Sequence, residues 1–581
     1  MMRKTKIVCT LGPSTDSEDT LRAMLLAGMN VARFNFSHGS HEEHKKRLDT
    51  LKRLRQELNL PVAAMLDTRG PEIRLKDFEG GSAQLKAGQE FTLTAGDALG
   101  TAERCAITCR ELAGDVAPGA SILLDDGLIR LTVLEVSGGD IRCRVENGGI
   151  IKNHKGVNVP GVRLSMPYLD AQDRADILFG AEEGFDFIAA SFVRSAADVM
   201  DIRRLLGGAH RSVRIIAKIE NQEGVNNLSE ILSVADGVMV ARGDMGVEID
   251  FTEIPIIQKE IIAQCMACGK PVITATQMLD SMIENPRPTR AEITDVANAI
   301  YDGTSAIMLS GETAAGKYPV EAVKTMDAIA RRTEADINYE KRMRGAVSSH
   351  HLSIAAATAH AACTTAMDIG ADAIITVSQR GVTARLVSRF HPGTPVVACL
   401  LDESIQRQMA LCWGVTPVLI PYARNTDELV DLAMEAARQA GLVNQGDLVV
   451  VTAGVPVGVP GTTNMIRVHL VGGALLTAVG VGTQKASGPL CACETLEDIS
   501  QKFQPGDVLV VPYTTNDMLP YMRQAAAIIS EESGANGHAA TVGLTLEKPV
   551  IVGATGAVST LTDGMLVSVD CARGTVQQLP Q

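Results

Sequence analysis

Residues 213–242 read VRIIAKIENQEGVNNLSEILSVADGVMVAR, and this stretch decides the fold. Two short apolar runs, 213–220 and 237–242, flank a segment with the residue spacing of a helix. Strands of a parallel sheet are buried on both faces and are joined by helices, so their sequence shows this alternation. The stretch therefore predicts a β-α-β unit.

The same alternation recurs throughout residues 1–345. Six further apolar runs have the length of a strand and lie at 4–10, 30–36, 62–67, 185–191, 271–276 and 305–310. Helical patterns follow the runs, for example at 17–27, 40–57, 196–206, 255–268 and 319–333. Eight such units predict an α/β fold of the (β/α)8 type, a TIM barrel that spans residues 1–70 and 168–345.

Residues 71–167 interrupt this alternation. Here apolar residues recur with a period of two, as in Ile129-Leu131-Val133, and Gly-Gly and Asp-Gly pairs separate the runs. A period of two with such turns is typical of antiparallel strands. We expect a small all-β domain inserted after the third barrel strand, where it would lie over the catalytic face of the barrel as a lid.

Two more α/β segments follow the barrel. The first spans 346–475, with strands expected near 372–377, 395–400, 415–420 and 447–452. The Gly-rich stretch 476–488 is interpreted as a linker, and 489–581 as a further compact α/β domain. Four domains agree with a length of 581 residues at about 150 residues per domain.

Composition argues against several classes of function. The chain has 54 basic and 68 acidic side chains, a net charge of −14, and nucleic-acid binding would need a basic face. No apolar stretch reaches the roughly 18 residues of a membrane span, and we expect no signal peptide at the start. The 12 cysteines are scattered, which is not the pattern of a disulfide framework. We expect a cytoplasmic protein without a membrane or nucleic-acid partner.

Three patterns look like ligand sites but are interpreted otherwise. The segment 311–318 nearly matches a P-loop, yet Tyr318 stands where a Ser or Thr hydroxyl must meet magnesium. Two cysteine pairs have zinc-like spacing but lack a second pair of ligands nearby: Cys265-x-x-Cys268 and Cys491-x-Cys493. Three histidines at helical spacing alternate with glutamates and lysines, as on a solvated helix face: His38, His41 and His44. We predict no metal at these positions.

Polar residues follow nearly every predicted barrel strand, at the end where TIM barrels carry their active sites. They are Arg33, Asn35 and Ser37 after the second strand, Asp67 and Thr68 after the third, Lys218 and Glu220 after the fifth, Arg242 and Asp244 after the sixth, Thr276 after the seventh and Glu312 after the eighth. Each of them alone is compatible with an exposed strand end or an ion pair. The whole ring predicts an active site.

The residue types indicate phosphoryl chemistry. Glu220 and Asp244 offer the hard oxygens that Mg2+ binds. Lys218 projects from the same face of its strand as Glu220, and a lysine beside a metal suits a migrating phosphoryl group. Four more residues offer oxygens that fit a monovalent cation, with hydrogen-bonded loop ends as the alternative: Asn35, Ser37, Asp67 and Thr68.

Five blocks of the barrel resemble the motifs of the pyruvate kinase family: NVARFNFSHG (30–39), LDTRGPEIR (66–74), IIAKIEN (215–221), MVARGDMGVEI (239–249) and ITATQMLDSM (273–282). The blocks are long and in order, and the resemblance covers residues 1–475. Residues 489–581 resemble the mobile phosphohistidine domain of phosphoenolpyruvate-utilising enzymes, a swivelling α/β domain that some bacterial pyruvate kinases carry.

The resemblance implies an activity and its requirements. A pyruvate kinase transfers the phosphoryl group of phosphoenolpyruvate to ADP and so gives pyruvate and ATP, the last step of glycolysis. The family implies Mg2+ or Mn2+ and K+ as cofactors, allosteric control by a phosphorylated small molecule, and a homotetramer.

The resemblance also implies a role for each matching residue. Arg33 would bind the phosphate of phosphoenolpyruvate, and Lys218 would stabilise the phosphoryl group in transit. The divalent metal would be held by Glu220 and Asp244, and K+ by Asn35, Ser37, Asp67 and Thr68. The substrate carboxylate would meet Gly243, Asp244 and Thr276, and a water relay near Thr276 would protonate the enolate. The nucleotide would meet Asn35, Phe36, Ser37, His38, Arg74 and, from the lid, Lys155.

Two other functions compete with this interpretation. A barrel that runs metal-assisted carbon–carbon lyase chemistry also needs a carboxylate pair, but it needs neither a nucleotide lid nor a potassium quartet. A barrel kept as an effector-binding scaffold is expected to lack Lys218 or a metal carboxylate, and this chain has them all. Glu72 in RGPEIR indicates potassium dependence, because family members that dispense with potassium tend to carry lysine there.

The loop 378–383 (SQRGVT) joins a predicted strand to a helical pattern, an arrangement that presents amides to a phosphate. Its candidate effector-binding residues are Ser378, Arg380, Gly381 and Thr383, and an ordinary βα loop is the alternative. The family usually has Thr and Ser where this chain has Ser378 and Arg380. AMP and sugar phosphates therefore both stay open as the effector.

His538 stands where the related mobile domains carry phosphate. Those domains have threonine two residues before the histidine and usually serine just before it, whereas this chain has Asn536 and Gly537. We interpret the C-terminal domain as an inert docking or regulatory domain, with a working phosphate carrier as the alternative.

Overall fold

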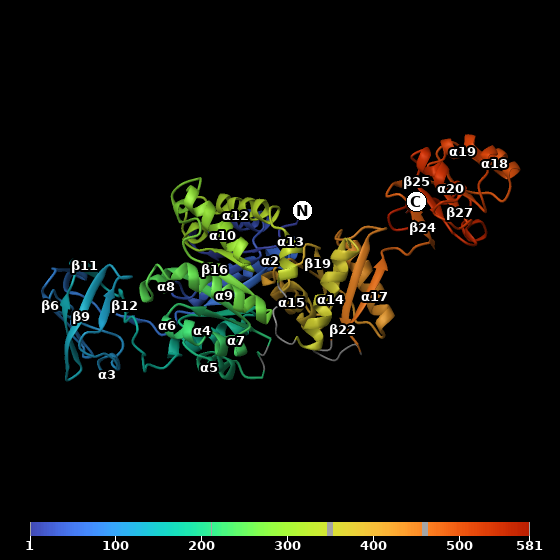
Figure 1. The fold of residues 1–581 in the computed structure, drawn as a ribbon. Helices are drawn as coiled ribbons and strands as arrows, with labels where there is room; N and C mark the ends of the chain where they lie inside the picture. Colours follow the sequence, from blue (N-terminus) through green and yellow to red (C-terminus); the bar gives the residue numbers. More distant parts are fainter. Residues whose placement is uncertain (1, 209, 211, 346–351, 456–462, 580–581) are drawn as a thin grey trace. The chain divides into compact units, whose positions relative to one another are not determined.

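The computed structural model describes residues 2–208, 210, 212–345, 352–455 and 463–579 (Figure 1). Eight strands close into a barrel in the order β1-β17-β16-β15-β14-β13-β3-β2, and neighbouring strands are parallel. They are β1 (Lys6–Leu11), β2 (Val31–Asn35), β3 (Ala63–Asp67), β13 (Phe187–Ala190), β14 (Arg214–Ile219), β15 (Gly237–Ala241), β16 (Val272–Ala275) and β17 (Ala306–Leu309). The predicted (β/α)8 barrel is confirmed.

Helices follow the barrel strands, and the longer ones cover the outer face of the barrel (Figure 1). They are α1 (Glu18–Leu26), α2 (His41–Glu57), α4 (Ala171–Glu182), α5 (Ala196–Leu206), α6 (Gln222–Asn226), α7 (Leu228–Val234), α8 (Arg242–Glu248), α9 (Ile254–Cys268), α10 (Arg290–Asp302), α11 (Gly311–Ala314), α12 (Pro319–Glu334) and α13 (Tyr339–Gly345). Local sequence sets their ends. Ser40 and Glu43 form a capping box at the start of α2, and Gly303, at φ 100°, ends α10 in the left-handed conformation.

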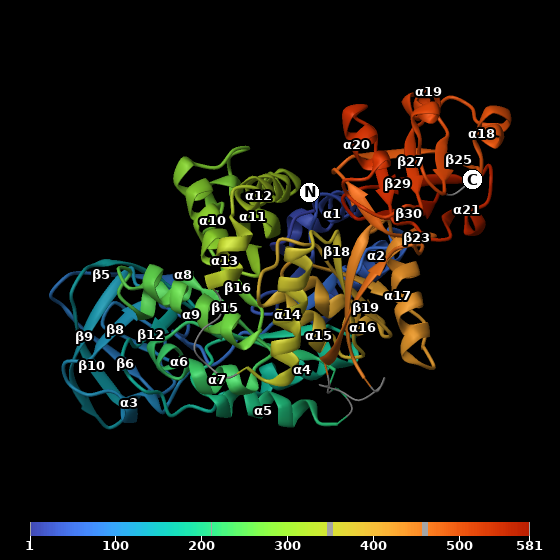
Figure 2. The same cartoon turned by 45° about the vertical axis from the view of Figure 1, so that its right-hand side comes forward.

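The inserted segment is a sheet of seven strands in the order β4-β12-β8-β9-β10-β6-β7, with a separate β11-β5 pair (Figures 1 and 2). The strands are β4 (Ile73–Arg74), β5 (Ser82–Leu85), β6 (Glu90–Thr94), β7 (Arg104–Ala106), β8 (Ser121–Leu124), β9 (Ile129–Ser137), β10 (Asp140–Val145), β11 (Gly149–Lys152) and β12 (Gly156–Asn158), with one short helix, α3 (Leu112–Asp115). Buried and exposed residues alternate along β9 and β10, which is the period of two that the sequence predicts.

The α/β segment after the barrel has a five-stranded sheet in the order β20-β19-β18-β21-β22. Its strands are β18 (Ala373–Val377), β19 (Val396–Leu400), β20 (Val415–Leu419), β21 (Leu448–Gly454) and β22 (Thr463–Leu470), and its helices are α14 (Ile354–Asp368), α15 (Val382–Ser388), α16 (Glu403–Gln408) and α17 (Thr426–Gln439). The expected start of this domain at residue 346 lies outside the described residues.

The C-terminal segment forms a sheet in the order β23-β30-β29-β25-β26-β27-β28-β24 (Figure 2). Its strands are β23 (Leu476–Thr477), β24 (Val479–Val481), β25 (Lys485–Ala492), β26 (Val508–Val511), β27 (Ala527–Ser530), β28 (Val550–Val552), β29 (Leu566–Asp570) and β30 (Thr575–Gln578). Its helices are α18 (Leu496–Lys502), α19 (Leu519–Gln524), α20 (His538–Thr545) and α21 (Ala557–Thr560).

The stretch 476–488, predicted to be a linker, contributes strands to this sheet, and Gly480 and Gly488 lie in two of them. β23 and β24 pair with β30 and β28, and β25 starts at Lys485. A side chain on Gly480 would place its Cβ 1.8 Å from the Cys571 carbonyl oxygen, and one on Gly488 would place it 2.4 Å from that of Gly506. These glycines allow close packing of backbones, so the flexible interpretation of the stretch is corrected.

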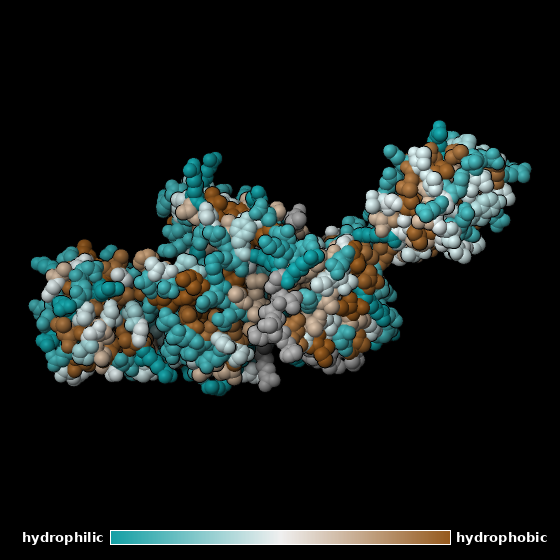
Figure 3. Space-filling view, in the orientation of Figure 1, coloured by the Kyte–Doolittle hydropathy of each residue, from teal (hydrophilic) through white to brown (hydrophobic). Residues whose placement is uncertain are grey.

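The face of the molecule seen in Figure 3 is mostly polar. In the view of Figure 3, hydrophilic and neutral residues cover most of the chain, and the hydrophobic ones lie in small groups. None of the helices in the described part of the chain is long and apolar enough to cross a membrane.

Candidate active site

The carboxyl ends of neighbouring barrel strands bring three charged side chains into contact. Arg33 at the end of β2 places Nε 2.5 Å from Oδ2 of Asp67, and its Nη1 donates to Thr10 Oγ1 at 3.0 Å. Lys218 on β14 places Nζ 3.0 Å from Oδ1 of the same aspartate. All three charged groups are buried, with exposed fractions of 9% or less. Three residues of the predicted ring, Arg33, Asp67 and Lys218, are therefore joined by ion pairs at the carboxyl ends of the strands.

Lys218 is surrounded by acceptors. Besides Asp67, its Nζ lies 3.1 Å from Oε1 of Glu220 and donates to Oγ of Ser191 at 2.7 Å. Burial alone would lower the pKa of Lys218, but the carboxylates of Asp67 and Glu220 raise it above its ordinary value. The side chain is therefore a fixed cation at neutral pH.

Glu220 has one oxygen, Oε1, whose partner is the ion pair with Lys218 at 3.1 Å rather than a hydrogen bond. Its Oε2 accepts the backbone N–H of Phe192 at 2.5 Å, whereas Oε1 is buried and accepts no hydrogen bond of good geometry. Burial raises the pKa of Glu220 to about 8, against the opposing effect of Lys218. A buried carboxylate with an unsatisfied oxygen, beside a second carboxylate at Asp244, has the donor chemistry that a divalent cation requires.

The turn after β16 holds Thr276 in a strained conformation. Thr276 has a φ of 67°, which a β-branched residue seldom adopts, and its hydroxyl accepts the N–H of Gly243 at 2.7 Å. Arg242 donates to the Thr276 carbonyl at 2.7 Å and forms a bidentate ion pair with Asp295. The surrounding hydrogen bonds thus fix the strained hydroxyl beside the Gly243 amide.

The four candidate potassium ligands come from β2, β3 and the loops that follow them. Asn35 pairs in register with Asp67, and its Oδ1 accepts the N–H of Ser37 at 3.2 Å. Thr68 is buried and accepts the N–H of Ser191 at its hydroxyl. The structure brings Asn35 and Asp67 together at one end of the barrel.

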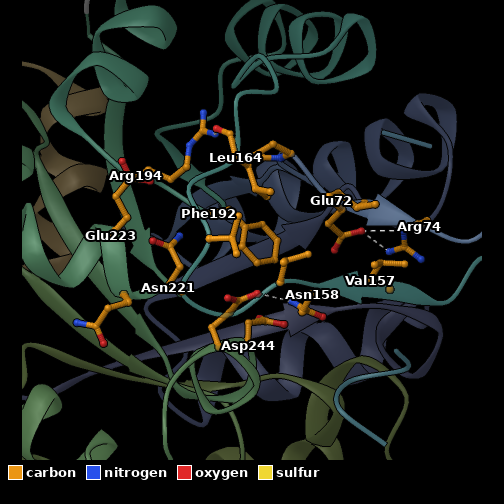
Figure 4. A pocket seen from close by; sticks show the side chains of 18 of the residues that line it. Glu72, Arg74, Val157, Asn158, Leu164, Phe192, Arg194, Asn221, Glu223 and Asp244 are labelled. Carbon is orange, nitrogen blue, oxygen red and sulfur yellow. Dashed lines mark hydrogen bonds and ion pairs between the residues drawn. The ribbon is translucent and has the colours of Figure 1, made fainter. Parts of the chain in front are cut away.

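A cleft of about 450 Å³ lies between the lid and the barrel end (Figure 4). The lid contributes Arg74, Lys155 and Asn158, and the barrel contributes Phe192 and Asp244. Four of the residues predicted to meet the nucleotide lie at the end of β2 and do not line this cleft: Asn35, Phe36, Ser37 and His38. Of the nucleotide-binding candidates, the cleft brings together Arg74 and Lys155.

Both cationic lid residues are held by acids. Arg74 forms an ion pair of 2.5 Å with Glu72 and donates to the His154 carbonyl, and Lys155 lies 2.7 Å from Asp125. These pairs are partly exposed, so they hold the cations loosely at the wall of the cleft. Glu72 itself lines the cleft.

The candidate effector loop lies between β18 and α15. Gly381, at φ 68°, is the N-cap residue of α15. The hydroxyl of Thr383 is buried and lies 2.7 Å from that of Thr463, whereas Arg380 is exposed. Among the candidate residues, Thr383 is thus already engaged by β22.

His538 begins α20, and both of its ring nitrogens have partners. Nδ1 lies 2.8 Å from Thr514 Oγ1, and Nε2 lies 3.0 Å from Asn516 Oδ1. The amide oxygen of Asn516 can only accept, so Nε2 donates to it, while the hydroxyl of Thr514 can act as either donor or acceptor toward Nδ1. Both ring nitrogens are therefore already engaged.

Two residues at the end of the fourth strand were missed by sequence reasoning. Ser191 contacts Lys218 and Asp67, and Phe192 adopts φ 52° and donates its N–H to Glu220. The only sequence signal is a serine after FDFIAA at 185–190, and a lone hydroxyl at a strand end is too common to stand out.

The comparisons with known proteins agree along the whole chain. Family models match it as pyruvate kinase, barrel domain (2–323), pyruvate kinase, alpha/beta domain (356–469), and PEP-utilising enzyme, mobile domain (503–574). It is 50% identical over 580 residues to a pyruvate kinase of Geobacillus stearothermophilus, covering 99% of both chains. The chain belongs to the pyruvate kinase family.

Further relatives agree with this assignment. A pyruvate kinase of Bacillus licheniformis is 47% identical over 578 residues, with 99% of each chain covered. A crystal structure of a pyruvate kinase from Cryptosporidium parvum superposes with a TM-score of 0.76 at 38% identity, covering 81% of this chain and 96% of that one. The chain is a phosphotransferase that moves the phosphoryl group of phosphoenolpyruvate to ADP, and the lyase and scaffold alternatives are set aside.

Proposed function

We propose that Lys218 is the group that stabilises the phosphoryl group as it passes from phosphoenolpyruvate to ADP. The observation that carries this role is the position of its ammonium, buried among Asp67, Glu220 and Ser191 at the catalytic end of the barrel. A cation fixed in advance stabilises developing negative charge without having to reorganise during the reaction. Arg33, held by Asp67, would bind the phosphate of the substrate.

Glu220 and Asp244 would hold Mg2+ or Mn2+. The Oε1 of Glu220 supports this assignment, because it accepts no hydrogen bond and its one ion-pair partner is Lys218 Nζ at 3.1 Å, so it keeps lone pairs that a divalent ion can use. When bound, the ion supplies a Lewis acid for the phosphoryl and enolate oxygens. The same neighbourhood would hold K+ through Asn35, Ser37, Asp67 and Thr68.

The reaction would end with protonation of the enolate. Thr276 and the backbone amides of Gly243 and Asp244 would receive the substrate carboxylate, which displaces the present bond between the Gly243 N–H and the Thr276 hydroxyl. A water held by the Thr276 hydroxyl would deliver the proton to the methylene carbon. Closure of the lid over the cleft would exclude bulk water, which otherwise competes with ADP as the phosphoryl acceptor.

The nucleotide would lie in the cleft, and its phosphates would meet Arg74 and Lys155. The remainder of the nucleotide would contact the end of β2 at Asn35, Phe36, Ser37 and His38. Both lid cations are partly exposed and paired with acids that a polyphosphate would replace. We further propose that the loop 378–383 binds a phosphorylated effector and that the enzyme acts as a homotetramer. We also propose that it works in the cytoplasm, where its 12 free thiols would stay reduced.

Metal binding and turnover together test the site. Glu220→Gln is expected to weaken Mn2+ binding, measured by electron paramagnetic resonance of the free ion, and to abolish ATP formation from phosphoenolpyruvate and ADP. Glu284→Gln, which changes an exposed glutamate paired with Lys317, is the matched control and is expected to alter neither. Unchanged Mn2+ affinity in the Glu220 variant would refute the assignment of the metal ligand.

A further inference from the structure

We propose that Ser191 is a positioning residue that fixes the Lys218 ammonium and ties it to both linkers of the lid. The inference rests on the proposed role of Lys218. Ser191 follows β13, one of two barrel strands, with β1, after which the sequence predicts no site residue, and it is 1% exposed.

The hydroxyl of Ser191 has a fully assigned set of partners. It accepts from Lys218 Nζ at 2.7 Å, and its own proton faces the carbonyl of Thr68 at 2.6 Å and Oδ1 of Asp67 at 3.2 Å. An ammonium has three N–H donors, and here they face Ser191, Asp67 at 3.0 Å and Glu220 at 3.1 Å. Of these three acceptors only Ser191 is uncharged. It therefore fixes the direction of the ammonium without adding a third negative charge beside Asp67 and Glu220.

The backbone of Ser191 is fixed as firmly as its side chain. Its N–H donates to the Thr68 hydroxyl at 3.1 Å, and its carbonyl accepts the phenol of Tyr168 at 2.9 Å. Tyr168 is buried, and burial raises its pKa well above the ordinary value, so the phenol stays protonated and can donate. The next residue, Phe192, holds Glu220 through its own N–H.

Both linkers of the lid meet at this point. Tyr168 lies between β12, which ends at Asn158, and α4, which begins at Ala171, and so belongs to the linker that returns from the lid. On the outgoing linker, Gly70 packs so closely that a Cβ there would lie 2.8 Å from the Cβ of Ser191. Gly70 has a φ of 78°, so the close contact and the backbone conformation both require glycine.

A path of two hydrogen bonds therefore joins the returning linker to the catalytic cation. It runs from the Tyr168 hydroxyl to the Ser191 carbonyl, and from the Ser191 hydroxyl to Lys218 Nζ. A movement of the lid that shifts its linkers is transmitted to Ser191. The position of the lid and the position of the ammonium are thus coupled through one residue.

Ser191→Ala is the decisive variant. Because a hydrogen bond to a charged group is lost, kcat should fall about 10- to 100-fold with little change in the KM for phosphoenolpyruvate. The half-saturating K+ concentration should rise about fivefold, since the Thr68 carbonyl loses its donor. Ser388→Ala is the matched control, because it removes a buried serine hydroxyl that donates to the Trp413 carbonyl at 2.7 Å, away from the barrel end.

Tyr168→Phe tests the coupling and guards against a Ser191 variant that does not fold. It should lower kcat about threefold to tenfold, and its effect should be smaller in the Ser191→Ala background than in the wild type. Full additivity of the two changes would overturn the coupling. A Ser191→Ala enzyme with normal kcat and normal K+ response would overturn the positioning role. If Lys218→Met is also fully active, the failure lies with the proposed function of the lysine instead.

Discussion

The carboxylate of Asp173, on α4, accepts the backbone N–H of Gly70 at 3.2 Å and so joins the helix after the lid to the linker before it. Asp173 is fully buried, and its second oxygen has no hydrogen-bond partner. Burial raises the pKa of Asp173 to about 6, against the lowering effect of the Gly70 N–H. The linker of the lid is therefore anchored by a carboxyl that is ionised only at some cost in stability.

This anchor predicts a dependence of stability on pH. The pKa is higher in the folded protein than its ordinary value, so the folded state binds more protons between about pH 4 and 6. The carboxyl therefore lowers the free energy of unfolding as pH rises through this window, by up to about 3 kcal/mol, and adds no further change above it. Asp173→Asn removes the titration and keeps an acceptor for Gly70.

Thermal unfolding at pH 4.5 and pH 7 measures the effect. The stability of Asp173→Asn relative to the wild type should rise between the two pH values, because the cost of burying the amide is the same at both. Asp49→Asn, which changes an exposed carboxylate on α2, is the control and should show no such rise. An equal difference at the two pH values would contradict the prediction.

Lys218→Met tests whether the Lys218 ammonium stabilises the phosphoryl group during its transfer. We expect kcat to fall by at least about 10²- to 10³-fold, because a single preorganised group contributes this much. Mn2+ binding should be largely kept, since Glu220 and Asp244 remain. Lys45→Met, which removes an exposed lysine of α2, is the control. Near-normal turnover of the Lys218 variant would show that its assigned role is wrong.

Potassium dependence should follow from Glu72. This carboxylate lines the cleft and pairs with Arg74 at 2.5 Å, so it brings no positive charge of its own to replace a monovalent cation. Activity in tetramethylammonium salts should be weak and should return on addition of K+. Glu72→Lys should reduce the dependence on K+. Full activity of the wild type without K+ would contradict the prediction.

The loop 378–383 should control the response to an effector. Thr383 shares a hydrogen bond of 2.7 Å with Thr463, so Thr383→Ala loosens the loop and also removes a phosphate donor. Ser378→Ala and Thr383→Ala should each weaken the shift that AMP or a sugar phosphate causes in the phosphoenolpyruvate saturation curve. Thr358→Ala, which removes a half-buried hydroxyl of α14 that donates to the Ile354 carbonyl, should not. The effector site is refuted if none of these compounds shifts the wild-type curve.

The barrel could be predicted because its strands are apolar runs, and the candidate active site is a prediction that rests on the polar residues that follow those runs. The run 213–220, for example, is mostly apolar and has the length of a strand, as expected for a strand buried on both faces of a parallel sheet. Lys218 and Glu220 appear at its end. Such signals are local. The contacts of Ser191 with Lys218 and Tyr168 join residues 27 and 23 positions apart in the sequence, and no local pattern encodes them.

For the stretch 476–488 the sequence contains a local signal, but that signal predicts the wrong structure. Its glycines have the composition of a linker, but Gly480 and Gly488 are glycine because a carbonyl of another strand lies where a Cβ would be. Composition cannot distinguish a glycine that gives flexibility from one that allows close packing. The strands it contains pair with β28, β29 and β30, about 70 to 100 residues later in the chain.

The paired strands also change how the C-terminal domain should be removed. A truncation at Ala486 would leave β23 and β24 without their partners β30 and β28 and would expose their edges. Truncation from Ala474 onward removes the whole sheet. It also removes Arg573, which donates to Asp372 at 2.7 Å and to the Gly446 carbonyl at 2.8 Å, so the preceding α/β domain should lose some stability.

His538 should not carry phosphate during catalysis. Its Nε2 lies 3.0 Å from Asn516 Oδ1 and its Nδ1 lies 2.8 Å from Thr514 Oγ1, so an attack on phosphorus by either nitrogen would break one of these contacts. Direct transfer to ADP needs no covalent intermediate. We therefore expect that His538→Ala, and truncation from Ala474, leave kcat largely intact while thermal stability or the effector response changes. The measurement is turnover together with phosphate analysis after incubation with labelled phosphoenolpyruvate. Acid-labile, base-stable label on His538 would show instead that the domain is a working carrier.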